Sequence, residues 1–500
     1  MPKYIGLTIG PLYKTMTRVK ATRELWASSY IFSYIMKKMI EKVIAYAGTD
    51  VFIIPYVKDE EIFKPGQQVG LFHDRFIFKA GNDDFEKVEQ IKKNVMEEIA
   101  ENMSQIISEN DSSKIYDFLN HYFQIYFCEM EIDGEYNKVN EELNKVLDGF
   151  ELQTKFIKEE EGEKSYLSEL FYRVNKSFLA KDAFGSIHSF PSIPEIAAIR
   201  GGGDLDWNGI ELRFQKDQNN ENTQDTDDTD IYKQLEEQNR ETIKQYHKYI
   251  AIVQADGDHL GETIKALKSD KDFGKLSKAL LKFSQDAHNS IKNYGGTTIY
   301  AGGDDLLFFA PVVSGKQNIF RFVEELAEMF GLQFQEFDPA PTLSAGISIT
   351  YYKYPMGEAL ESAANLLFHE AKETGGRNAI AYEVQKHSGQ RITGVFHRKD
   401  EDYEAFKDLI YNKEDNKMLT SLIHKLSFHG ALIEEIGKDV KKVRNYFDNF
   451  FNEEEHNTHV GIKENAAKLI NAAYTNTKRS QKKEIVFSVL RLKKFLEGGE

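Results

Sequence analysis

The chain has 500 residues, a formal net charge of −16 at pH 7 and 41% hydrophobic residues. Its length predicts about two to four domains, and its negative charge excludes a surface that binds nucleic acid over its whole extent. The single cysteine, Cys128, excludes an internal disulfide and a multi-cysteine zinc site. We find neither a signal peptide nor an apolar run of about 18 residues that could span a membrane. These features predict a soluble cytoplasmic protein without zinc or membrane contact.

A first unit is expected over residues 1–130. Its apolar runs and amphipathic stretches predict strands over 4–10, 51–54 and 75–78, and helices over 22–46, 84–110 and 113–127. This order predicts an α+β fold of the ferredoxin-like kind. The dipeptide His73-Asp74 is interpreted as a loop, because a His-Asp phosphohydrolase needs further histidines and aspartates on helices.

The middle of the chain has weaker patterns. Residues 131–214 are expected to form a mixed insert of helices and loops, with a short helix after Phe190-Pro191-Ser192. The run Gly201-Gly202-Gly203-Asp204 has neither the preceding strand nor the lysine of a phosphate loop, so we interpret it as flexible. Residues 215–245 are interpreted as a disordered linker, because their first half contains almost nothing apolar.

A second unit is expected over residues 246–390. The same patterns predict strands over 249–258, 342–350 and 378–382, a hairpin over 298–310, and helices over 258–293, 316–330 and 357–373. This order again predicts a sheet with helices on one face. The chain is therefore expected to contain two palm-like units.

The second unit carries two acidic motifs, each of which follows an apolar strand. One strand ends in Asp256-Gly257-Asp258, and the hairpin turn is Gly302-Gly303-Asp304-Asp305. The glycines allow positive φ angles and leave room for an anion, and carboxylate oxygens are ligands that Mg²⁺ and Mn²⁺ prefer. Alone, each motif is also compatible with an ordinary turn or a helix cap. Together they match the way in which palm domains of polymerases and nucleotide cyclases bring carboxylates to two metal ions.

The paired motifs predict a phosphoryl transfer site with two Mg²⁺ or Mn²⁺ ions and a nucleotide triphosphate. We expect Asp256, Asp304 and Asp305 to be catalytic, and these side chains with the Gly257 carbonyl to hold the ions. One ion would activate an attacking hydroxyl, and the other would hold the triphosphate. The residues expected to contact the nucleotide are Gly257, Asp258, Ser277, Gly302, Gly303, Lys372, Arg377 and Asn378.

Three of these residues have a plainer alternative. Lys372 and Arg377 flank the end of an expected helix, where cations are favoured in any protein. Our hypothesis places Lys372 on the triphosphate, where it would offset negative charge. Ser277 lies in the middle of an expected helix, where a serine often has no special role, and our hypothesis is a contact to the base.

Residues 391–500 predict a helical domain without recognisable chemistry. Its last part is basic, with Lys478-Arg479, Lys482-Lys483 and the stretch from Arg491 to Lys494. They are compatible with a solvated helix face, or with a contact to RNA or to a neighbouring subunit.

Four groups of residues resemble the large palm-domain subunit of type III CRISPR–Cas RNA-guided complexes, most closely in the Cmr (type III-B) branch. They are Leu7-Thr8-Ile9-Gly10-Pro11 with Thr22-Arg23-Glu24-Leu25-Trp26-Ala27-Ser28-Ser29-Tyr30; Phe190-Pro191-Ser192; Ala255-Asp256-Gly257-Asp258 with Tyr300-Ala301-Gly302-Gly303-Asp304-Asp305; and Thr342-Leu343-Ser344-Ala345-Gly346 with Ala371-Lys372 and Gly376-Arg377-Asn378. They span most of the chain in the order that the family has.

The resemblance implies two ferredoxin-like palm domains with helical inserts and a C-terminal helical bundle. It implies that the second palm uses ATP to make a signalling nucleotide when the complex captures target RNA, with nucleotides bound between the palms. The implied partners are the other protein subunits of the complex, and guide RNA and target RNA reached mainly through those subunits. The His-Asp nuclease domain and the cysteine zinc site of many relatives are missing from this sequence. We therefore expect no DNA cleavage and no zinc.

The product and the activity itself have alternatives. Most relatives are understood to make cyclic oligoadenylate, whereas some Cmr-branch members join AMP to S-adenosylmethionine. Both reactions use the attack of a 3′-hydroxyl on the α-phosphate of ATP, so the acidic motifs do not separate them. A catalytically silent scaffold subunit remains a different class of function. A stand-alone nucleotide cyclase is disfavoured by the N-terminal resemblance.

Overall fold

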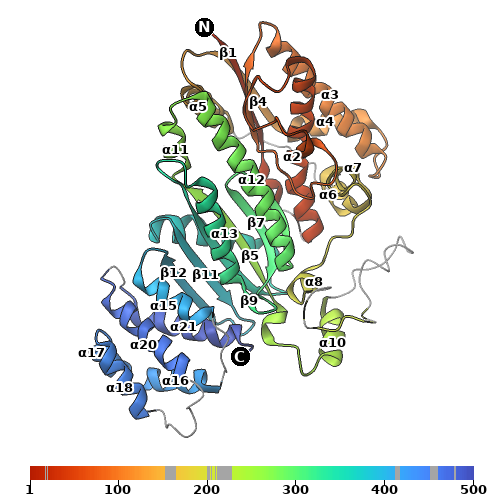
Figure 1. The fold of residues 1–500 in the computed structure, drawn as a ribbon. Helices are drawn as coiled ribbons and strands as arrows, with labels where there is room; N and C mark the ends of the chain where they lie inside the picture. The colour runs from red at the N-terminus through yellow and green to blue at the C-terminus, as the bar shows by residue number, and fades with distance from the viewer. Residues whose placement is uncertain are drawn as a thin grey trace.

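The computed structural model describes residues 1–16, 19, 21–152, 165–199, 203, 205–208, 210, 228–411, 417–450, 460–477 and 480–499. Within these residues, a four-stranded sheet and a six-stranded sheet form the centres of two α+β units, and helices follow at the C-terminal end (Figure 1). The expected α+β fold is confirmed.

The first sheet has the strand order β2-β3-β1-β4, and its neighbouring strands are antiparallel. Its strands are β1 (Lys3–Gly10), β2 (Phe52–Ile54), β3 (Arg75–Ala80) and β4 (Gln124–Glu131), and its helices are α1 (Leu12–Met16), α2 (Thr22–Ala47), α3 (Asp84–Ser104), α4 (Ser112–Tyr122) and α5 (Tyr136–Glu151). Because side chains alternate along a strand, Ile5 and Leu7 of β1 are buried in the core that contains α2. Gly6 faces the other way, where α5 covers the sheet.

One expected helix of this unit is wrong at its end. The prediction continued a helix to residue 127, but α4 ends at Tyr122 and β4 begins at Gln124. The run Ile125-Tyr126-Phe127 is β-branched and aromatic, which favours a strand. β4 then pairs with β1 over its whole length and completes the ferredoxin-like order.

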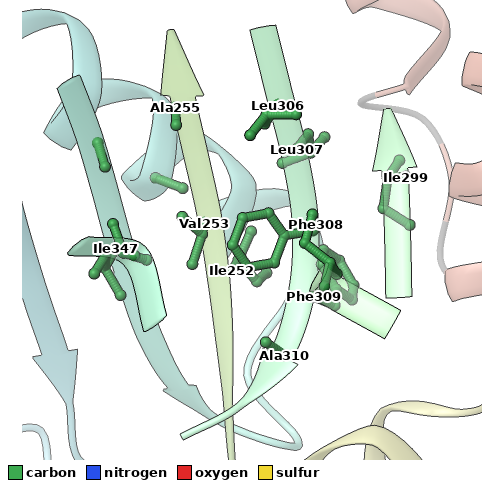
Figure 2. Packing of buried hydrophobic residues seen from close by; sticks show 14 of the residues in the cluster. Ile252, Val253, Ala255, Ile299, Leu306, Leu307, Phe308, Phe309, Ala310 and Ile347 are labelled. Atoms are coloured by element: carbon green, nitrogen blue, oxygen red, sulfur yellow. The ribbon is translucent and has the colours of Figure 1, made fainter. Parts of the chain in front are cut away.

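The second sheet has the order β12-β11-β10-β5-β7-β6. Its strands are β5 (Tyr249–Asp258), β6 (Thr297–Gly302), β7 (Asp305–Pro311), β10 (Thr342–Tyr351), β11 (Ala379–Gln385) and β12 (Arg391–His397). Its helices are α11 (Leu260–Ala266), α12 (Asp270–Tyr294), α13 (Ile319–Phe334) and α14 (Met356–Asn365), which continues into the π-helical segment η4 (Leu366–Thr374). Figure 2 shows Val253 of β5 and Phe308 and Phe309 of β7, three fully buried side chains at the centre of this sheet.

The second sheet extends past the boundary that the sequence predicts at residue 390. β12 pairs with β11 from Gln385↔Arg391 to Ala379↔His397, so this unit continues to His397. The C-terminal helices are α15 (Glu401–Ile410), α16 (Lys417–Phe428), α17 (Gly430–Ile436), α18 (Val440–Phe450), α20 (Val460–Thr475) and α21 (Lys482–Leu496). α21 contacts β12 and joins this bundle to the sheet.

The insert between the two units consists of short elements. They are α6 (Tyr166–Tyr172), η2 (Val174–Lys176), α7 (Phe178–Phe184), α8 (Ile193–Ala197), α10 (Asp228–Gln238) and η3 (Gln245–Lys248). Two further short elements lie within the units: η1 (Glu60–Phe63) in the first, and the hairpin of β8 (Val313–Ser314) and β9 (Gln317–Asn318) in the second. The expected disorder is wrong for the second half of residues 215–245. This half forms α10, and Ile231, Tyr232 and Leu235 are buried on one face of that helix. Residues 215–227, Gly201, Gly202, Asp204 and Lys478-Arg479 lie outside the described residues.

The two units pack directly on each other. α2 of the first unit contacts β6 of the second, and α12 contacts β2 and α5. At this interface the Tyr136 backbone N–H donates to Asp270 Oδ1 at 2.8 Å, and Lys292 Nζ donates to Gln68 Oε1 at 3.1 Å. In the part of the chain that the structure describes, no helix is long and apolar enough to cross a membrane.

Candidate nucleotide and metal site

The two acidic motifs lie side by side, as the sequence predicts. β5 pairs with β7 up to Ala255↔Leu306, so the next residues of the two strands, Asp256 and Asp305, lie side by side at the same end of this strand pair. The intervening turn has Gly303 at φ +67°, a conformation that favours glycine. Asp304 packs directly on Gly257, since a Cβ built on Gly257 would lie 2.6 Å from Asp304 Oδ2. Any larger residue at position 257 would displace this carboxylate.

A lysine already touches two of the oxygens expected to bind metal. Lys372, near the end of η4, forms an ion pair with Asp256 Oδ1, and its Nζ donates to the Gly257 carbonyl at 3.1 Å. Burial, and then the charge of Arg377, lowers the pKa of Lys372 to about 8. Lys372 thus lies beside the acidic motifs, and its contact with a triphosphate stays a prediction. The ammonium group marks a position at which these oxygens hold a cation.

The turn carries more negative charge than its surroundings stabilise. Burial raises the pKa of Asp304 to about 6, and the charge of Asp258 adds to the shift. Burial also raises the pKa of Asp305 well above its usual range, and the charges of Asp304 and Asp74 raise it further. A bound cation would favour the ionised carboxylates and reverse these shifts.

The oxygen donors therefore fit Mg²⁺ or Mn²⁺. Asp256, Asp304 and the Gly257 carbonyl supply hard oxygen ligands at one point, and Asp305 is adjacent. Among the described residues, no three His, Cys, Asp or Glu side chains are grouped as a ready-made metal centre. A metal here would complete its shell with backbone and phosphate oxygens, as Mg²⁺ in nucleotide sites commonly does.

The side chain of Asp258 has a different place from the expected one. It is fully buried, and its carboxylate accepts hydrogen bonds from the Thr342 and Ser344 hydroxyls at 2.9 and 2.8 Å and from the Asn378 backbone N–H at 2.9 Å. These bonds join the end of β5 to β10 and to the turn after η4. Asp258 is thus a positioning residue, and the expected direct nucleotide contact of its side chain is corrected.

The turn after η4 holds the other two residues expected at this end. Arg377 and Asn378 have φ angles of +68° and +43°, and Gly376 has +75°. The Arg377 side chain is exposed, and its charge affects the pKa of Lys372. The Asn378 backbone is held by Asp258. Arg377 is therefore available to a ligand, whereas Asn378 is held within the fold through its N–H.

Ser277 lies at a cavity between the two units. The cavity has a volume of about 280 Å³, and α12 contributes Asp270, Gly274 and Ser277 to its wall. The first unit contributes Phe52, Ile53, Tyr56, Lys58 and Tyr136, among others. Seven residues further along α12, Ser284 donates to the Gly303 carbonyl at 3.2 Å, so one helix connects this cavity with the acidic turn.

His73 and Asp74 of the first unit lie in a loop, as expected, but their position at the acidic turn was not predicted. A Cβ built on Gly303 would lie 2.3 Å from His73 Cε1, so the imidazole lies directly against the acidic turn. Burial lowers the pKa of His73 to about 4 and raises that of Asp74. The available signal was their position immediately before a predicted central strand, where loops of such sheets carry functional residues.

Two family models match parts of the chain. Residues 249–381 match the second palm domain of Cas10/Cmr2, and residues 4–108 match the N-terminal domain of the CRISPR-associated protein Cmr2. Over 169 residues the chain is 32% identical to the CRISPR system Cmr subunit Cmr2 of Pyrococcus furiosus. This match covers 28% of the chain and 19% of that protein, so it spans about a fifth of the curated relative.

Solved structures agree on the fold. A type III-B Cmr-beta structure in the apo state matches with a TM-score of 0.56 at 11% identity, over 100% of this chain and 82% of that chain. The apo Csm1–Csm4 cassette matches with a TM-score of 0.52 at 12% identity, over 99% and 70%. The Csm1–Csm4 cassette in complex with pppApA matches with a TM-score of 0.51 at 11% identity, over 94% and 69%. The expected palm-domain architecture is confirmed.

Proposed function

The chain belongs to the Cas10/Cmr2 family, in its Cmr (type III-B) branch, and from this premise we propose that it is the nucleotidyltransferase subunit of a type III RNA-guided complex. When the complex binds target RNA, the second palm transfers the adenylate of ATP to a hydroxyl acceptor and releases pyrophosphate. Partner subunits supply most contacts to guide and target RNA, because a chain of net charge −16 opposes phosphates.

One observation carries this proposal. Asp256, the Gly257 carbonyl and Asp304 converge at the end of β5, and Lys372 contacts two of these three groups. Bound Mg²⁺ or Mn²⁺ would activate the acceptor hydroxyl and neutralise charge on the phosphates. Asp256, Asp304 and the Gly257 carbonyl would hold these ions, with Asp305 beside them. Lys372 would then bind the triphosphate of ATP and stabilise the leaving pyrophosphate.

The cavity between the palms supports the position of a nucleotide. Both palms line this cavity, and α12, which forms part of its wall, also contacts the acidic turn through Ser284. Csm1–Csm4 cassettes of the same fold have been solved in complex with pppApA, with cA4 and with AMPPNP. We propose that Ser277 contacts a base there, and that the product is cyclic oligoadenylate or AMP joined to S-adenosylmethionine.

The test is product analysis of the assembled complex. The complex with guide RNA receives ATP and Mg²⁺, with and without target RNA and with and without S-adenosylmethionine, and mass spectrometry identifies the products. We expect an adenylate-containing product and pyrophosphate only when target RNA is present. A product that forms only with S-adenosylmethionine identifies it as the acceptor. Target-bound complex that leaves ATP unchanged in all mixtures would contradict the proposal.

A catalytically silent scaffold is the second candidate. It is favoured by the absence, among described residues, of a complete side-chain metal cluster, and by the ion pair that already occupies Asp256. In that case substitution of the acidic turn would impair assembly of the complex rather than turnover.

A further inference from the structure

The first palm reaches the acidic turn of the second palm through His73. The ring lies so close to Gly303 that a Cβ on that glycine would be 2.3 Å from Cε1 and 2.8 Å from Nε2. The turn conformation, with φ +67° at Gly303, and the absence of a side chain there both make room for the imidazole. This contact joins residues that are more than two hundred positions apart in the sequence.

The backbone on both sides of His73 is held firmly. The Phe72 N–H donates to Ser33 Oγ of α2 at 2.9 Å, and Gly70 packs on the same serine. On the other side, the Ile9 N–H of β1 donates to the Asp74 carbonyl at 2.9 Å. The first palm thus presents the imidazole from two fixed elements, α2 and β1.

The ring has hydrogen-bonding capacity that the protein does not use. Within the part of the chain that the structure describes, neither ring nitrogen of His73 has a hydrogen-bond partner. A neutral imidazole offers one donor and one acceptor. The side chain is half-buried, and its nitrogens are not among the fully buried polar atoms that lack a partner, so they remain accessible to a ligand at the turn.

Charge decides which part of a ligand this is. The triphosphate of ATP belongs with Lys372 on the β5 side of the turn, where the cation lies. On the His73 side, the neighbouring Asp74 carries a carboxylate whose charge is felt at Asp305. A carboxylate repels phosphates and favours an uncharged hydroxyl. The His73 side therefore suits the acceptor.

We propose that His73 positions the attacking hydroxyl of the acceptor nucleoside, by accepting a hydrogen bond from that hydroxyl at a ring nitrogen. The inference rests on the nucleotidyl transfer proposed above. The hydroxyl oxygen forms a bond to the α-phosphorus of ATP, and the bond from that phosphorus to the bridging oxygen breaks. Pyrophosphate leaves with the electron pair, and the hydroxyl proton passes to water. His73 orients the oxygen and keeps no proton, so it is a positioning residue.

The test separates donor from acceptor. Labelled 3′-deoxy-ATP lacks the 3′-hydroxyl and serves only as donor, while unlabelled ATP or S-adenosylmethionine is varied as acceptor in the target-bound complex. His73→Phe keeps a ring against Gly303 and removes both nitrogens. We expect kcat/KM for the acceptor to fall about tenfold or more, the effect of one lost hydrogen bond to a reacting group. KM for the donor should change less than about twofold, because His73 lies away from Lys372.

Two further variants complete the design. His73→Gln retains a donor and an acceptor near the position of Nε2, and should keep acceptor kcat/KM within about threefold of wild type. His121→Phe makes the same replacement in α4 of the first palm, where Nδ1 contacts the Asp117 carbonyl of its own helix. It should leave both constants unchanged. Wild-type acceptor kinetics in His73→Phe, or equal impairment in His73→Gln, overturn the positioning role and leave the proposed function intact. A wild-type complex without any transfer overturns both proposals.

Discussion

The two palms share one strand order, but the residues at the ends of their central strands have different roles. In each, the fourth, first, third and second strands of the unit are neighbours: β4-β1-β3-β2 in the first and β10-β5-β7-β6 in the second. The residues that begin the third strand therefore occupy corresponding positions. Counted from that point, Arg75 of β3 corresponds to Asp305 of β7, and Asp74 to Asp304. Thr8, the partner of Arg75, corresponds to Asp256.

In the first palm, the side chains at these positions bind helix α5. Arg75 forms ion pairs with Asp148 and Glu151 of α5, each at 2.7 Å, and the Thr8 hydroxyl donates to Glu151. In the second palm, Lys372 is the one ion-pair partner of the corresponding carboxylates among the residues that the structure describes, and burial raises the pKa values of Asp304 and Asp305. The fold thus supplies the same geometry in both palms, and unbalanced charge distinguishes the candidate site from its structural counterpart.

The largest effect is expected from removal of that unbalanced charge. Replacing Asp304 and Asp305 together by Asn keeps side-chain size and removes both negative charges. Pyrophosphate release from ATP by the target-bound complex should fall by at least on the order of 10²–10³, because loss of one well-placed electrostatic group already has such an effect. Folding should change little, since two neighbouring carboxylates repel each other without a metal.

The control for this variant is another pair of adjacent acids. Glu60 and Glu61 lie in η1 of the first palm and are exposed, and their replacement by Gln should leave pyrophosphate release unchanged. Guide and target RNA should bind normally in both variants. Near-normal release in the double Asn variant would show that the acidic turn is not the active site. Failure of that variant to assemble would favour the scaffold function.

The second palm was more predictable from sequence than the first. Its strands are long apolar runs that end in turn residues, so the adjacency of Asp256 and Asp304 followed from strand order alone. β4 was missed because the aromatic run after α4 continues a helical pattern without a break. β12 was missed because its buried and exposed residues alternate in a polar stretch that was assigned to the helical domain.

The roles of single residues were less predictable than their positions. Asp258 belongs to an acidic motif in the sequence, yet its carboxylate accepts hydrogen bonds from Thr342, Ser344 and the Asn378 backbone. In the sequence, His73-Asp74 is a dipeptide without a recognisable motif around it. The packing of the two palms brings His73 to Gly303. Such contacts join distant segments and leave no periodic signal in either one. Local patterns therefore predicted the scaffold of the site but not how the two palms share it.

A smaller effect on turnover is expected from Lys372→Met. This change removes the cation that contacts Asp256 and Gly257 while keeping an unbranched side chain of similar length. Pyrophosphate release should fall on the order of 10²-fold, because the triphosphate loses its counter-charge. The affinity of the complex for Mn²⁺ alone, measured by electron paramagnetic resonance, should instead rise about three- to fivefold, the effect of removing one competing ion pair.

The control for Lys372 is Lys316→Met, which changes an exposed lysine in the hairpin between β8 and β9. It should alter neither turnover nor Mn²⁺ affinity. If Lys372→Met also leaves Mn²⁺ affinity unchanged, the ammonium does not occupy a position that a metal uses.

The smallest effect is expected at the structural counterpart in the first palm. Arg75→Met removes the ion pairs to Asp148 and Glu151 but keeps part of the packing volume of the side chain. Because both acids are more than a third exposed, with 61% and 38% of their side-chain surface accessible, the free energy of unfolding should fall by only about 1 kcal/mol. Chemical denaturation of the purified chain measures this change. The control is Lys145→Met, which removes an exposed ion pair with Glu141 on the same helix.

The double Asn variant of the acidic turn should show the opposite pattern, with unfolding unchanged and turnover lost. An Arg75→Met variant that keeps wild-type stability but loses turnover would mean that the first palm's edge is catalytic as well, and the distinction between the two palms would fail.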